Sequence, residues 1–214
     1  MIKSILWDFD GVIAESVNVK TDAFYEMYLP YGKDVAECVV EHHMENGGVS
    51  RFEKFRHYHN TFLNIKLTDQ DIKTMSQTFS DLVLRKVVSS PYIPGVIEFI
   101  QKTQSKYKHF VISGTPNEEM KEIVSQRNIQ DLFQDVMGSP KTKTEWIHEL
   151  VKSNKIEISQ SVFVGDAMTD FKAANETGMK FVLREVDYNI DLFNKYMGVR
   201  VKDFVSFYTV VEAM

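Results

Sequence analysis

The sequence predicts an α/β fold in which a parallel sheet is interrupted by one helical insertion. Five short apolar runs of β-prone residues are nearly continuous rather than alternating, which is typical of strands covered on both faces. Segments with helical spacing separate the last four runs, as in right-handed βαβ units. A long stretch after the first run has helical patterns and no convincing strand.

The strands and helices of the core follow in order along the chain. The first predicted strand covers residues 2–9, and the others cover residues 109–113, 135–138, 161–165 and 180–183. Helices are predicted between the last four strands, at residues 117–127, 144–153 and 169–176. Residues 201–214 predict a final strand and helix that pack on the core.

Residues 16–90 are expected to form a separate helical domain. A turn-rich sequence, SSPYIPG at residues 89–95, then returns the chain to the sheet. We therefore expect a core domain made of residues 1–15 and 91–214. The helical patterns inside the insertion cover residues 17–28, 35–44, 50–63 and 69–88.

Composition limits the function classes. The 214 residues carry a net charge of −5, which provides no basic surface for nucleic acid. Cys38 is the only cysteine, so the chain can form neither an internal disulfide nor a thiolate zinc cluster. No apolar run is long enough for a membrane span and no basic leader precedes the first strand, so we expect a cytoplasmic protein.

Polar residues follow four of the predicted strands where each strand ends. In an open parallel sheet these ends meet at one edge, where ligands bind. Each residue alone is typical of a turn or a helix cap. Brought together, they would form a cluster of buried charges. Such a cluster costs on the order of several kcal/mol of folding free energy unless a group of opposite charge pairs with it. The residues are Asp8 and Asp10; Ser113, Gly114 and Thr115; Lys141 and Lys143; and Asp166 and Asp170.

A magnesium ion would stabilise such a cluster, because Mg²⁺ prefers a few carboxylates, water and substrate phosphate. Asp8 could then attack a phosphoryl group, as carboxylate nucleophiles do. Asp10, two residues later on the same side of the strand, could exchange a proton with the leaving group. Gly11 would allow close backbone approach to the phosphoryl group. Ser113 and the Gly114 amide would bind a phosphoryl oxygen.

The motifs DFDGV, VISGT, a lysine near a helix start and GDAMTD together resemble the haloacid dehalogenase-like (HAD) hydrolase superfamily. They occur in that family's order across residues 8–170. The resemblance implies a Rossmann-like core and Mg²⁺-dependent phosphoryl transfer through an aspartyl-phosphate. The insertion resembles the α-helical cap domain of the phosphoglycolate phosphatase and β-phosphoglucomutase group.

The resemblance also implies a role for each motif residue. Asp8 would be the nucleophile and Asp10 the general acid/base. Asp8, the Asp10 backbone carbonyl and Asp166 would bind the metal, with Asp170 supporting them. The carboxylate at Asp10 favours phosphate esters, because similar dehalogenases and phosphonatases lack it.

Two lysines fit the third motif. Lys141 has the spacing to Asp166 of phosphoglycolate phosphatases, and Lys143 that of phosphoserine phosphatases. We favour Lys143 as the phosphate-binding lysine, because a predicted helix starts directly behind it. Lys141 would then be a solvated loop residue.

The sequence ENGGVSRFEKFRHYH, residues 45–59, offers candidate substrate contacts in the insertion. Arg51 and Lys54 lie on one side of its predicted helix. They could form a solvated basic face, or they could belong to a loop that closes over the core and meets an anionic group of the substrate.

The leading hypothesis is thus a Mg²⁺-dependent phosphatase that hydrolyses a small phosphorylated metabolite. The alternatives are a sugar-phosphate mutase of the same superfamily and a non-catalytic HAD-like binding module. The presence of every motif residue argues against the binding module.

Overall fold

A six-stranded parallel sheet forms the centre of the computed structural model, which describes residues 1–214. The strand order β3-β2-β1-β4-β5-β6 confirms the predicted α/β class. The sixth strand begins two residues before the position expected for the final strand. The strands are β1 (Ser4–Trp7), β2 (Lys108–Pro116), β3 (Asp135–Ser139), β4 (Ser161–Gly165), β5 (Lys180–Arg184) and β6 (Val199–Val201).

Nine α-helices accompany the sheet. The sequence patterns predicted eight of them and missed α5, which follows directly on the turn-rich segment. The helices are α1 (Val17–Tyr28), α2 (Lys33–Glu45), α3 (Arg51–Phe62), α4 (Asp69–Ser89), α5 (Val96–Thr103), α6 (Asn117–Gln126), α7 (Lys143–Lys152), α8 (Met168–Thr177) and α9 (Phe207–Glu212).

Both faces of the sheet are buried, which explains the nearly continuous apolar strands. Trp7 points to one face, where its ring packs against Phe99 of α5 and Phe207 of α9. Its neighbour Leu6 points to the other face and belongs to a second apolar cluster, which includes Ile147 of α7 and Ala173 of α8. Adjacent residues of one strand therefore hold different helices on opposite faces.

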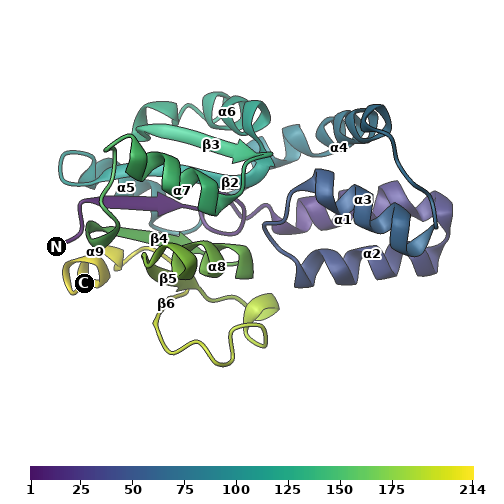
Figure 1. The fold of residues 1–214 in the computed structure, drawn as a ribbon. Coiled ribbons are helices and arrows are strands. Elements are labelled where there is room, and N and C mark those ends of the chain that lie inside the picture. The colour runs from purple at the N-terminus through teal and green to yellow at the C-terminus, as the bar shows by residue number, and fades with distance from the viewer.

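Helices α1–α4 lie together beyond the carboxyl ends of the strands, where the arrows of Figure 1 point. Both chain termini lie at the opposite end of the sheet (Figure 1). The aromatic side chains of Phe24, Tyr58 and Phe79 pack together inside this helical group. None of the helices is long and apolar enough to cross a membrane. The arrangement places the strand ends opposite the inserted helices.

Candidate active site

Asp8 lies one residue beyond the end of β1 and is buried. Its backbone amide donates to the Val164 carbonyl of β4 (2.9 Å), so the sheet pairing continues to this residue. Its Oδ1 accepts from the Phe9 amide (2.7 Å). The second oxygen, Oδ2, is directed to a lysine. The strand end thus holds the carboxylate in one orientation.

Three buried carboxylates meet beside this strand end. One oxygen from each of Asp8, Asp166 and Asp170 lies within 4.8 Å of the others. Burial and the charge of Asp170 raise the pKa of Asp8 well above its usual range. The same two causes raise the pKa of Asp166 to about 7. The cluster is therefore unfavourable as a group of free anions.

The donor set fits a hard divalent cation. Both carboxylate oxygens of Asp170 already accept hydrogen bonds. Oδ1 accepts from the Lys143 ammonium, and Oδ2 accepts from the Asp166 and Ala167 amides. Asp8 and Asp166 retain carboxylate lone pairs for an ion. The carboxylate of Asp10 lies outside this three-member group. A Mg²⁺ ion would offset the repulsion that raises both pKa values.

Lys143 is the lysine that the structure brings to Asp8. Its Nζ lies 2.9 Å from Asp8 Oδ2 and also contacts Asp170. Although burial lowers the pKa of Lys143, the charges of Asp170 and Asp8 raise it overall, so the amine stays protonated. Lys141 instead lies exposed and pairs with Glu149.

The position of Lys143 follows from the start of α7, whose first residue it is. Thr142 caps this helix by accepting from the Glu145 amide, and Glu145 accepts from the Thr142 amide in return. This reciprocal capping box fixes where the helix begins. The Lys143 side chain is thereby held beside Asp8 at the carboxyl ends of the strands.

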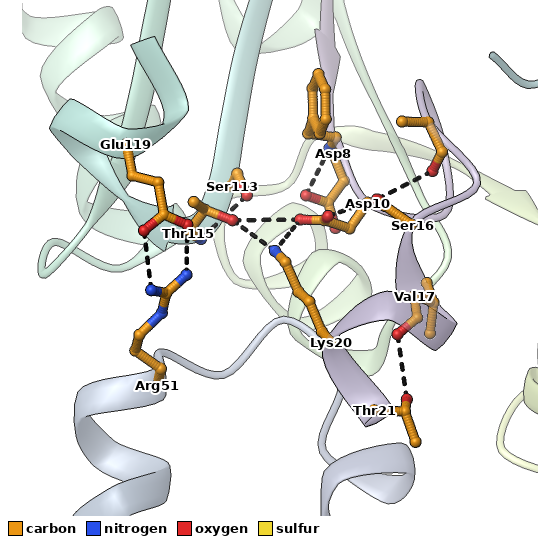
Figure 2. Close-up of polar contacts among 12 residues, drawn as sticks. Asp8, Asp10, Ser16, Val17, Lys20, Thr21, Arg51, Ser113, Thr115 and Glu119 are labelled. Atoms are coloured by element: carbon orange, nitrogen blue, oxygen red, sulfur yellow. Dashed lines mark hydrogen bonds and ion pairs between the residues drawn. The ribbon is translucent and has the colours of Figure 1, made fainter. Parts of the chain in front are cut away.

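Asp10 belongs to a second polar network, which Figure 2 shows. Its Oδ2 accepts from Lys20 of α1 at 2.5 Å, and its Oδ1 accepts from Ser16 at 2.6 Å. Thr115 also donates to Oδ2 at 3.3 Å. Burial alone would raise the pKa of Asp10, but the charge and hydrogen bonds of these neighbours lower it below the usual value. Lys20 was not predicted from the sequence.

Ser113 and Gly114 end the apolar part of β2 and line the same pocket as Asp8 and Asp10. The Ser113 hydroxyl accepts from the Thr115 amide at 3.1 Å, so its proton remains available to a ligand. Gly114 lies against the insertion, because a Cβ there would stand 2.4 Å from the Gly48 carbonyl oxygen. The glycine therefore permits close contact between β2 and the turn after α2.

Gly11 is surrounded by residues of the other strand ends. A Cβ at this position would lie 2.4 Å from Asp166 Oδ2 and 2.6 Å from the Tyr188 hydroxyl. Tyr188 donates to Asp166 Oδ2 (2.5 Å), and Asn189 donates to the Asp166 carbonyl (2.8 Å). Tyr188 and Asn189 were not predicted, because no motif marks the loop after β5. Both orient Asp166.

Arg51 and Lys54 are buried, with exposed fractions of 5% and 2%. The interpretation of a solvated basic face is therefore wrong. Arg51 donates two hydrogen bonds to Glu119 of α6, at 2.6 and 2.9 Å (Figure 2). Lys54 Nζ lies 2.8 Å from His43 Nδ1. Both basic side chains line the pocket above Asp8.

A comparison with protein families places this geometry among known proteins. Residues 5–184 match the model of the haloacid dehalogenase-like hydrolases. The chain belongs to this hydrolase family. The family resemblance inferred from the motifs is thus confirmed. A comparison with curated protein sequences found no match.

Solved structures of other family members share the fold over nearly the whole chain. A predicted phosphoglycolate phosphatase from Haemophilus somnus is 20% identical, with a TM-score of 0.74 and coverage of 98% of this chain and 97% of its own. The β-phosphoglucomutase of Clostridium difficile is 18% identical, with a TM-score of 0.76 and coverage of 99% and 96%. The HAD-hydrolase YfnB of Bacillus subtilis, solved with bound magnesium, is 13% identical, with a TM-score of 0.71 and coverage of 99% of each chain.

Proposed function

We propose that this HAD-like hydrolase is a Mg²⁺-dependent phosphatase that acts on a small phosphorylated metabolite through an aspartyl-phosphate. One observation carries the proposal. Asp8 offers a buried carboxylate at the floor of a pocket, with Lys143 at 2.9 Å and Asp166 beside it. A nucleophile, a countercharge and a metal ligand thus converge on one place.

The first step forms the phosphoryl-enzyme. An Asp8 oxygen attacks phosphorus, and the bond between phosphorus and the ester oxygen breaks. Asp10, when protonated, gives its proton to the departing oxygen, so that a neutral alcohol leaves. Lys143, together with Ser113 and the Gly114 amide, would stabilise charge on the phosphoryl oxygens.

The second step regenerates the enzyme. Water attacks phosphorus, and the bond to the Asp8 oxygen breaks to release inorganic phosphate. Asp10 takes the proton of that water. The lowered pKa of Asp10 keeps it in the carboxylate form that this step needs. Lys20 is therefore a positioning residue for the second step, because its ion pair favours the Asp10 carboxylate.

The metal would be held by Asp8, Asp166 and the backbone carbonyl of Asp10. When bound, Mg²⁺ supplies positive charge that stabilises the phosphoryl oxygens. Tyr188 keeps the Asp166 carboxylate turned toward Asp8 through its hydrogen bond. Burial and the Asp166 charge raise the pKa of Tyr188, so the phenol stays protonated and keeps donating.

We further propose that residues 16–90 act as a cap over a core of residues 1–15 and 91–214. The pocket above Asp8 is lined from both sides, by Lys20, Phe24 and Lys54 of the insertion and by the strand ends. Closure of the cap would exclude water while the phosphoryl group is transferred.

The test is a screen for phosphate release over a panel of phosphorylated metabolites, with and without Mg²⁺. We expect release that requires Mg²⁺ and that Asp8→Asn abolishes. Asp22→Asn is the matched control, because Asp22 is an exposed aspartate of α1. Full activity of Asp8→Asn, or activity indifferent to Mg²⁺ removal, would refute the proposal.

The same screen separates a mutase from a phosphatase, and both activities occur among the names of the structural neighbours. A mutase would convert a hexose phosphate into its isomer with little free phosphate. Analysis of the products by NMR distinguishes these outcomes. We expect free phosphate.

A further inference from the structure

The pocket above Asp8 contains one buried amine that has no acidic partner. Lys54 of α3 is 2% exposed and lines this pocket. Its Nζ contacts only His43, through Nδ1 at 2.8 Å and the carbonyl oxygen at 3.4 Å. These contacts account for two of the three protons of an ammonium group. The third is free for a ligand.

The other basic side chains of the pocket are already neutralised. Lys20 pairs with Asp10, and Arg51 pairs with Glu119. Lys54 forms no ion pair. The pocket therefore has one positive group left without a counter-ion.

The surroundings of Lys54 make a free charge unfavourable. The ring of Phe24 lies 5.6 Å from Nζ, and the His43 ring packs against the same phenyl ring. Burial and the charge of Lys54 lower the pKa of His43 well below its usual value, so His43 is a neutral acceptor. Burial and the charge of Lys20 lower the pKa of Lys54 to about 7. An anion beside Lys54 would supply the missing countercharge.

We propose that Lys54 binds an anionic oxygen group on the alcohol portion of the substrate, either a carboxylate or a second phosphate. This inference rests on the proposed phosphatase function, and it narrows the substrate class to phosphate esters that carry a second acidic group. The transferred phosphoryl group would lie at Asp8, and the second group at the insertion's wall of the same pocket.

The geometry assigns this role to Lys54 rather than to Arg51. Both Arg51 terminal nitrogens are occupied by the Glu119 carboxylate, and one of them also donates to Ser80 at 2.8 Å. The Arg51 charge already has a buried counter-ion in Glu119, whereas the Lys54 ammonium has none and would gain one from a substrate anion.

Matched substrates test the inference. Phosphoglycerate and glycerol phosphate differ only in a carboxylate in place of a hydroxymethyl group, and propanediol bisphosphate and propanediol phosphate differ only in the second phosphate. We expect the anionic member of at least one pair to have a kcat/KM higher by about tenfold or more, the range of a charge-assisted hydrogen bond. The pair that shows the preference identifies the acidic group.

Lys54→Met should abolish this preference, whereas Lys73→Met should retain it. Lys73 is an exposed lysine of α4 and serves as the matched control. Equal kcat/KM values within both pairs for the wild-type protein would overturn the inference, and this comparison needs no variant. A preference that persists in a folded Lys54→Met protein would also overturn it.

A binding measurement separates this inference from the proposed function. Calorimetry on Asp8→Asn protein should show tighter binding of the anionic member, and Lys54→Met in that background should remove the difference. If wild-type protein releases no phosphate but this binding difference is present, the phosphatase proposal fails and the Lys54 assignment stands. If phosphate is released but neither binding nor turnover favours an anionic member, only the Lys54 assignment fails.

Discussion

At the scale of single residues, Gly11 shows how closely the acids of different strands are packed. Its φ of +73° lies in the left-handed region, and a Cβ would stand 2.4 Å from Asp166 Oδ2. The position therefore excludes side chains for two independent reasons. One is the backbone conformation and the other is the space that the Asp166 carboxylate occupies.

Gly11→Ala tests whether this space matters to the site. We expect a loss of about 1 kcal/mol in the free energy of unfolding from the positive φ. We also expect a loss of about 100-fold in kcat, because Asp166 must move. The Mg²⁺ affinity measured by calorimetry should fall with it, by about tenfold or more.

Gly178→Ala is the matched control for this change. Gly178 ends α8 with the same φ of +73°, but a Cβ there would meet no neighbouring atom within 4 Å. This variant should lose a similar amount of stability and keep its kcat and metal affinity. Equal kcat values for the two alanine variants would show that the space beside Asp166 is unimportant.

The sequence predicted the acids and the lysine of the site but not their partners. Asp8, Asp166 and Lys143 occur in motifs with recognisable spacing. Lys20 and Tyr188 stand in segments that look like an ordinary helix and loop. Their contacts with Asp10 and Asp166 arise only when distant segments pack together. A single sequence contains no local signal for such pairs.

At the scale of elements, His109 joins β2 to its neighbours. Its Nδ1 accepts from the Trp7 indole of β1 (3.1 Å), and its Nε2 lies 3.2 Å from the Thr103 hydroxyl of α5. The indole can only donate, so Nδ1 must be unprotonated and the ring neutral. Burial accordingly lowers the pKa of His109 to about 4.

This buried neutral ring predicts a pH dependence of stability. The pKa of His109 rises from about 4 in the folded chain to about 6.5 in the unfolded chain, so the unfolded state binds more protons between these values. Stability contributed by the neutral ring is complete above pH 6.5 and is lost as the pH falls toward 4, by up to about 3 kcal/mol. Urea unfolding at several pH values between 4 and 6.5 measures how steeply the free energy of unfolding changes with pH.

His109→Gln should remove that part of the slope, whereas His148→Gln should leave it unchanged. His148 is an exposed histidine of α7. Carboxylates that titrate in the same pH window contribute equally to the wild-type protein and to both variants. The decisive quantity is therefore the difference in pH dependence of the free energy of unfolding between each variant and the wild-type protein. An unchanged slope for His109→Gln would contradict the buried neutral ring.

Elements with a strong pattern were predictable, and α5 was not. The continuous apolar strands are buried on both faces, which is the physical cause of their pattern. Helix α5 has only eight residues and starts at Val96, directly after a segment rich in proline and glycine. Eight residues make about two helical turns. Next to turn-forming residues, two turns are too few to establish a helical periodicity of the apolar residues.

At the scale of the whole molecule, Glu119 joins the inserted helices to the sheet domain. It lies in α6, directly after β2, and pairs with Arg51 of α3 while accepting from Ser80 of α4. The pair is nearly inaccessible to solvent, with side chains 4% and 8% exposed. The pair therefore links the insertion to the strands, and removal of one partner would leave the other charge buried without a counter-ion.

Glu119→Gln should weaken this junction. Loss of the carboxylate leaves the Arg51 charge buried, so we expect the free energy of unfolding to fall by about 3 kcal/mol. Small-angle scattering should show a larger radius of gyration if the insertion moves away. Glu118→Gln, at the exposed neighbouring position, should change stability by less than about 0.5 kcal/mol. Identical behaviour of the two variants would show that the pair does not hold the junction.

The sequence predicted a helical insertion at residues 16–90 but not how it meets the strands. Arg51 and Lys54 occur in a basic segment, which alone is equally consistent with a solvated face. Their burial depends on Glu119 and His43, which lie on other elements. Such long-range pairing is a property of the assembled chain.

The proposed phosphatase mechanism requires Asp8 to take up the phosphoryl group. The direct test is to mix the protein with Mg²⁺ and a turned-over substrate, quench with acid within one turnover, and map phosphorylation by mass spectrometry. We predict one phosphoryl group on the peptide that contains Asp8, and none in Asp8→Asn. Phosphate release in the first turnover without phosphorylation of Asp8 would contradict this mechanism.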